Sequence, residues 1–168
     1  RAEIFAEEKV KGFHEGIGKR YACSRKFYDC LCGLELLRSD WDMLLEEAGI
    51  VLYRSGRRFY DILLEDFEIW IAKSGIDLTT QCEQLLVYFI DTYFCGGVYD
   101  GCVFDKVNMA VASVFLIYEL LAVIWDVQNG RIDFSDVVKM VYRFSRELEH
   151  SDSNILKAQK WPSLLRFL

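Results

Sequence analysis

Four basic side chains near the end of the chain recur at helical spacing, at Lys139, Arg143, Arg146 and His150. At about 100° per residue they fall on one side of a helix, opposite the side that holds the apolar residues of the same segment. Those apolar residues are Val137, Val141, Phe144 and Leu148. Such a basic row can bind an anionic ligand or an acidic partner surface. The alternative is a solvated helix face, in which Arg143 pairs with Glu147 for roughly a few tenths of a kcal/mol.

Glu147 and His150 have the i, i+3 spacing of the pairs that bind iron in carboxylate-bridged di-iron bundles. Those sites need a second such pair and further glutamates that project into the core. The other histidine, His14, has Lys11 three residues before it, and Glu147 is expected on the polar side of its helix. The sequence therefore predicts no di-iron site.

The cysteine spacing does not match a metal site either. Cys23, Cys30 and Cys32 are separated by six residues and by one, whereas zinc and iron–sulfur ligands come in close pairs or runs. We expect the six cysteines to be reduced thiols that are mostly buried as small hydrophobic side chains. No Ser/His/Asp set can be assembled, and Gly16-x-Gly18 follows no strand. Catalytic and cofactor-binding residues therefore stay unassigned.

These side chains must be positioned by helices, because the apolar residues recur at helical spacing almost throughout. Residues 1–168 are expected to form a single all-α domain, an irregular bundle of six to eight helices. Ser39, Thr80 and Ser135 are expected to cap three of them, and residues 96–103 to form a turn. The expected helices span residues 3–17, 20–37, 39–54, 59–73, 80–94, 104–126, 135–150 and 153–160.

Composition and charge limit the class of protein. Hydrophobic residues make up 52% of the chain, which excludes intrinsic disorder, and one proline with eleven glycines is too little for the turns of a β-sandwich. The net charge of −6 argues against binding nucleic acid through its phosphates. The chain starts without an apolar leader and its cysteines are expected to be reduced, so we expect a cytoplasmic protein. Arg1 in place of Met suggests either a domain of a longer chain or the product of processing.

The segment from Val107 to Trp125 is apolar and nearly long enough to span a membrane. Glu119 lies near the middle of this segment, where a carboxylate would be costly in lipid. We therefore expect no membrane contact. The segment is instead predicted to be the most buried helix, with Phe115, Leu116 and Leu120 in the core.

Three segments of the chain resemble one protein family in their order and spacing. YRFSRELEHSDSN, Tyr142–Asn154, resembles a signature near the C-terminus of the flagellin lysine-N-methylase family, in which a Tyr-Ser-Arg-x-x-Glu-His-like run ends a helix. Leu85–Leu121 resembles the preceding helix pair of that family, and Gly33–Ala48 resembles the segment before it. The resemblance covers most of residues 27–157, with Phe144 where the family usually has Tyr.

The resemblance implies that the chain is the helical C-terminal part of a bacterial protein that transfers a methyl group to lysine ε-amino groups of flagellin. The family's N-terminal half is rich in cysteine and is thought to hold an iron–sulfur cluster, and the reaction needs a methyl donor. The cysteines of this chain lie at other positions. We therefore expect no cofactor in this part of the protein and no activity from it alone.

Residues of the signature that lie outside the core would then face the missing N-terminal half or the flagellin substrate. These candidate interdomain or substrate-facing residues are Lys139, Arg143, Arg146, Glu149 and His150. The alternative is a stand-alone helical protein-interaction module without enzymatic activity. A cysteine-rich reading frame directly upstream of the encoding gene would distinguish the first interpretation from the second.

Overall fold

The computed structural model describes residues 19–161, and over this range the chain forms helices and no strand. The predicted all-α fold class is therefore confirmed, while the expected helix 3–17 lies outside the described residues. The first described helix covers residues 19–32. It is followed by α2 (Ser39–Tyr53), α3 (Arg57–Ser74), α4 (Leu78–Asp100), α5 (Val103–Val127), α6 (Phe134–Glu149) and α7 (Asp152–Ala158).

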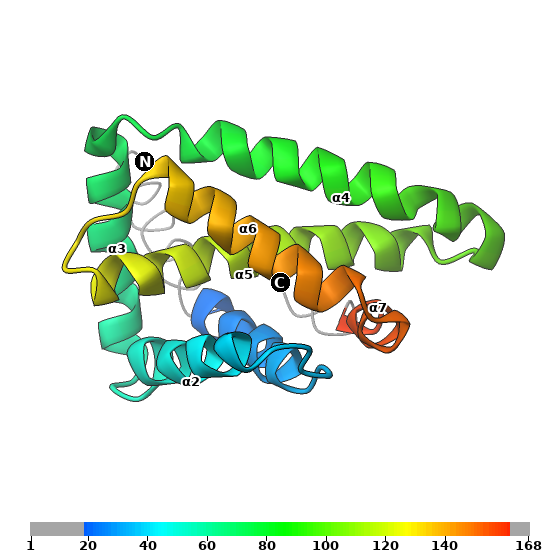
Figure 1. Ribbon diagram of the computed structural model, residues 1–168, viewed down its shortest axis with the longest axis horizontal. Helices are drawn as coiled ribbons and strands as arrows, with labels where there is room; N and C mark the ends of the chain where they lie inside the picture. The colour runs from blue at the N-terminus through cyan, green and yellow to red at the C-terminus, as the bar shows by residue number, and fades with distance from the viewer. Residues whose placement is uncertain (1–18, 162–168) are drawn as a thin grey trace, which may run out of the picture.

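The bundle is built around α5, which contacts α2, α3, α4 and α6. Helices α4 and α5 form a long antiparallel hairpin (Figure 1). In this view α4 runs along one side of α5, while helix 19–32 and α2 lie on the other side (Figure 1). Helix α3 crosses the end of the hairpin where α4 begins, and α6 packs along the middle of α5 (Figure 1).

Helix α5 supplies much of the core, as its apolar sequence predicts. Leu116 and Leu120 are 2% and 1% exposed, in agreement with prediction, whereas Phe115 is only partly buried. By length and composition α5 is the one described helix that could cross a membrane. That is weak evidence, because 61% of its most apolar window is buried inside the fold and a core helix meets the same criterion.

The turn between α4 and α5 is shorter than the sequence indicates. Residues 96–103 were expected to form a turn, but α4 continues to Asp100 and α5 begins at Val103. Gly101 makes the reversal possible, since its φ of 72° is a left-handed conformation that glycine adopts without a steric penalty. The glycines at 96 and 97 lie inside α4, so their turn propensity is overridden by the packing of α4 on α5.

Helix α6 begins with a capping box, although not at the expected residue. Asp133 is the N-cap, and its carboxylate accepts a hydrogen bond from the backbone N–H of Asp136 at 3.0 Å. The Asp136 carboxylate in turn accepts one from the backbone N–H of Asp133 at 3.0 Å. The expectation that Ser135 caps this helix is wrong, because Asp133, two residues earlier, is the N-cap and forms the reciprocal pair with Asp136.

Two other expected caps are displaced by a few residues. Helix α2 has Arg38 at its N-cap, without a side-chain hydrogen bond, and Ser39 is its first residue. Helix α4 begins at Leu78, where Asp77 Oδ1 accepts a hydrogen bond from the backbone N–H of Thr80 at 3.1 Å. Thr80 therefore lies inside the first turn and does not cap the helix.

Residues 33–38 leave the helical path that was expected to run from 20 to 37. The backbone N–H of Gly33 donates to Cys30 at 3.1 Å, and that of Leu34 donates to Leu31 at 3.2 Å, which tightens the last turn. Leu34 is buried, and the chain then runs extended into α2. The side chains that hold this extended segment come from the other end of the chain.

Candidate functional site

The segment Tyr142–Asn154 holds the 33–38 connection against the bundle. Asn154 is fully buried, and its Oδ1 accepts a hydrogen bond from the backbone N–H of Glu35 at 2.7 Å. Its Nδ2 donates to the backbone oxygens of Glu35 and Glu147 at 2.9 and 2.8 Å. Ser151 caps α7 by accepting from the Asn154 N–H, and its hydroxyl donates to the Glu35 carboxylate at 3.2 Å. These motif residues therefore act as a clamp between distant parts of the chain.

Glu147 belongs to the same clamp. Its side chain is 2% exposed, and Oε2 accepts a hydrogen bond from the backbone N–H of Leu37 at 2.9 Å. The expectation that Glu147 lies on the polar side of α6 and pairs with Arg143 is wrong. Glu147 lies two turns after Met140, which is completely buried, so the two side chains share the inward side of the helix.

Arg143 ties α6 to the start of α2. Its Nη2 donates to the backbone oxygen of Asp40 at 2.6 Å, and its Nε lies 3.6 Å from Asp40 Oδ2. The hydrogen bond from Arg38, and to a smaller extent the charge of Arg143, hold the pKa of Asp40 below its usual value. Arg143 therefore makes its polar contacts within the domain, where it joins α6 to α2.

Arg146 has side-chain N–H groups that make no hydrogen bond among the described residues. Its guanidinium lies 5.4 Å from the centroid of the Tyr142 ring, and Nη2 is 3.8 Å from Glu147 Oε1. The side chain is 19% exposed, and Nε and Nη2 have no hydrogen-bond partner among the described residues. Lys139 and the C-cap residue His150 are exposed, and Lys139 Nζ is 3.5 Å from Asp136 Oδ1.

Glu149 contacts α4. Its carboxylate accepts a hydrogen bond from Tyr93 at 2.9 Å and from Tyr88 at 3.2 Å. Burial, and then the hydrogen bond with Glu149, raise the pKa of Tyr93 above its ordinary value. The five residues expected on one surface are thus divided, because Glu149 fastens α6 to α4.

An apolar groove of about 430 Å³ lies between α4 and α6, beside the basic residues. Its α6 wall includes Phe134, Val138 and Tyr142, which are 52%, 51% and 63% exposed. We call Phe134, Val138, Tyr142, Lys139 and Arg146 together the α6 face. The sequence reasoning overlooked its apolar part, although the four-residue spacing of these three apolar side chains was a signal for it.

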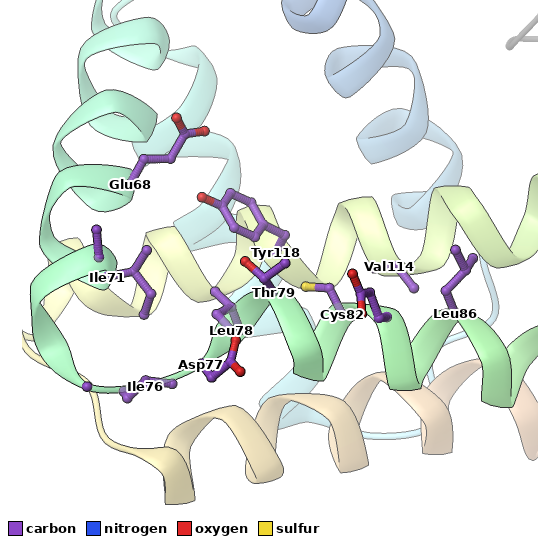
Figure 2. Close-up of a pocket in the computed structure, with 13 residues that line it drawn as sticks. Glu68, Ile71, Ile76, Asp77, Leu78, Thr79, Cys82, Leu86, Val114 and Tyr118 are labelled. Carbon is purple, nitrogen blue, oxygen red and sulfur yellow. The ribbon is translucent and has the colours of Figure 1, made fainter.

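A larger groove of about 820 Å³ lies where α3, α4 and α5 meet (Figure 2). Tyr118 points from α5 toward α3, which carries Glu68, and Cys82 of α4 lies between them and Leu86 (Figure 2). Burial raises the pKa of the Cys82 thiol. The sequence reasoning missed this groove, because each helix contributes only a few of its residues.

The most strongly perturbed carboxyl group is Glu119, in the centre of α5. It is 1% exposed, accepts a hydrogen bond from Ser24 at 2.5 Å and accepts another from Tyr60. Burial raises its pKa to about 7, against the opposing effect of these hydrogen bonds. Glu119 lines neither described groove, so its role is to join the helices that surround it.

The described residues do not fit an iron–sulfur cluster of the kind that the resemblance implies for the complete protein. Within 19–161, no three His, Cys, Asp or Glu side chains gather closely enough to hold a metal ion. Of the six cysteines only Cys23 is buried, whereas Cys32, Cys95 and Cys102 are exposed. The expectation of mostly buried thiols is therefore wrong: Cys32 ends helix 19–32, Cys95 lies on an exposed side of α4, and Cys102 is the N-cap of α5.

The fold and the α6–α7 clamp define an all-α helical domain in which a C-terminal motif fastens an upstream connection. The chain belongs to the family described as the FliB lysine N-methylase C-terminal domain, whose family model matches residues 8–162. It is thus the C-terminal domain of a FliB-like lysine N-methylase, as the resemblance predicted. No curated protein and no solved structure gives a significant match to the chain.

Proposed function

We propose that this domain docks the N-terminal half of a complete protein-lysine N-methylase through the α6 face. The complete protein transfers methyl groups to lysine ε-amino groups of flagellin in the bacterial cytoplasm. The observation that carries the docking role is the row Phe134, Val138 and Tyr142, each of which is more than half exposed. Contiguous exposed apolar residues with a polar rim mark protein interaction sites.

The basic side of the α6 face defines the chemistry of the partner. Arg146 Nε and Nη2 make no hydrogen bond among the described residues, although Nη2 lies 3.8 Å from Glu147 Oε1, and the side chain is sheltered from solvent. A sheltered guanidinium gains most from a carboxylate that binds it with good geometry. The complementary surface therefore carries apolar side chains and at least one Asp or Glu opposite Arg146.

The N-terminal half of the same protein is the partner that these observations favour. The family is described as a C-terminal domain, which supports a further part of the protein on the N-terminal side. A covalently linked partner is present at a high effective concentration. A groove of about 430 Å³ with modest apolar area is therefore sufficient for docking.

The proposal is tested by replacing Val138 with Asp in the complete methylase. A carboxylate in the apolar row would be unpaired in the interface, so we expect weaker association of separately expressed halves and slower flagellin methylation. The matched control is Met43→Asp on α2, which is 64% exposed and belongs neither to the α6 face nor to the groove beside it. If the Val138→Asp and Met43→Asp variants associated equally well with the N-terminal half, the docking role would be contradicted.

A further inference from the structure

We propose that the groove between α3, α4 and α5 receives the side chain of the substrate lysine. This inference rests on the lysine-methylating function proposed above, and it names the part of this domain that would bind the substrate.

The apolar part of the groove suits the aliphatic stem of a lysine. Ile71 of α3, Leu86 of α4 and Val114 of α5 line it from three helices (Figure 2). Its volume of about 820 Å³ is larger than a single side chain needs, and it is open to solvent. A lysine binds such a surface by laying its methylene chain on apolar side chains while its ammonium group remains at a polar end.

The polar part of the groove carries the charge that an ammonium group requires. Glu68, Asp77 and Glu83 line it, and none of the described residues that line it is basic. Hydrogen bonds from Thr80 lower the pKa of Asp77, so this carboxylate stays ionised at neutral pH. The lining residues therefore attract a cation.

Arg20 of this chain places a positively charged group at one end of the groove. Its Nη1 lies 3.1 Å from Glu68 Oε1, and its guanidinium carbon is 5.9 Å from the centroid of the Tyr118 ring. A carboxylate and an aromatic face together are a favourable environment for a cation. The end of the groove formed by Glu68 and Tyr118 thus already holds a cation from this chain, and the substrate ammonium group would compete with it or bind beside it.

The two grooves lie on different sides of the first half of α4, because consecutive residues of a helix point about 100° apart. Cys82 and Leu86 line the acidic groove, whereas Gln81 and Leu85 line the apolar groove that borders α6. A helix with its side chains is about 10 Å across. An N-terminal half that docks on the α6 face would therefore lie close to a lysine in the acidic groove.

The test uses the 168-residue chain and a small probe, Nα-acetyl-lysine methylamide, followed by nuclear magnetic resonance. We expect saturable shifts of the Cys82, Val114 and Tyr118 signals. The uncharged norleucine analogue should produce no saturable shift at the same concentrations. The proposal would be overturned if only signals of residues outside the groove showed saturable shifts, or if the norleucine analogue bound equally well.

Matched variants sharpen this test. Glu68→Gln combined with Glu83→Gln should weaken probe binding several-fold, whereas Glu46→Gln on α2 removes a carboxylate outside the groove and should leave binding unchanged. Arg20→Ala removes the competing cation and should tighten binding by up to about fivefold, the change that an exposed ion pair supports. Unchanged binding in the double variant would overturn the proposal.

The outcome can be separated from that of the docking proposal. Probe binding requires only this domain, so its failure would leave association through the α6 face untouched. Conversely, a domain that binds the lysine probe through the groove but does not associate with the N-terminal half would contradict only the docking proposal.

Discussion

Glu119 of α5 and Tyr60 of α3 share a hydrogen bond in the centre of the bundle, with both side chains at most 1% exposed. Ser24 of helix 19–32 donates to the second carboxylate oxygen of Glu119 and lies 2.5 Å from the hydroxyl of Tyr53 in α2. One carboxyl group therefore joins elements from four parts of the chain. Its burial also makes the stability of the domain depend on pH.

The stability of the domain should fall as the pH rises from about 4.5 to about 7. Burial raises the pKa of Glu119 from an ordinary 4.5 to about 7, so over this interval the unfolded chain has released a proton that the folded chain retains. The contribution is fully present below the lower value and is lost as the pH passes the upper one. It amounts to about 3 kcal/mol.

This pH dependence is measured by urea denaturation at pH 5 and at pH 7.5. Glu119→Gln cannot ionise, so the variant should lose this part of the pH dependence. Glu46→Gln on the exposed side of α2 should retain it. An identical pH slope in wild type and Glu119→Gln would show that Glu119 does not titrate with a raised pKa.

Leu116→Ala should lower the free energy of unfolding by about 2–5 kcal/mol. Leu116 is 2% exposed and lies on the central helix, so truncation leaves a cavity that the surrounding helices cannot close. Val111→Ala on the same helix is the control, because Val111 is 41% exposed and should lose far less. A denaturation midpoint that is unchanged in Leu116→Ala would place α5 at the periphery of the fold.

Asn154→Ala should release the 33–38 connection from the bundle. The change removes three hydrogen bonds and leaves the Glu35 backbone groups unpaired, at a cost of about 1–3 kcal/mol for each buried group that stays unsatisfied. Hydrogen exchange should accelerate at residues 33–38 more than in α5. The neighbouring exposed Ser153→Ala should have no such effect, and unchanged protection of 33–38 in Asn154→Ala would argue against the clamp.

Arg146→Ala should have a small effect on the isolated domain and a large effect on the complete protein. In the isolated chain it removes a contact with Tyr142 and a long 3.8 Å approach to Glu147, so we expect a loss of no more than about 1 kcal/mol. In the complete methylase it removes the proposed partner of a carboxylate from the N-terminal half, so association and flagellin methylation should decrease. Arg57→Ala on α3, at an exposed arginine outside the α6 face, is the control. If Arg146→Ala had equally small effects in the isolated chain and in the complete methylase, the basic row would be a solvated helix face without a docking role.

The sequence by itself predicts the helical class, most helix positions and the inward residues of α5 and α6. Leu116, Phe144 and Leu148 are buried as their spacing requires, because an apolar stripe on a helix is a local pattern that has to face the core. The collinear motifs that end in Tyr142–Asn154 likewise predicted the family that the family model identifies.

The tertiary structure decided what the polar residues do. Glu147 and Asn154 hold a connection more than 100 residues earlier, and Glu149 turns to Tyr93 on α4. Both grooves are likewise formed by residues of separate helices. Helical spacing specifies the direction in which a side chain points from the axis of its own helix. It does not specify which distant backbone or side chain lies there, because that depends on how the helices pack against one another.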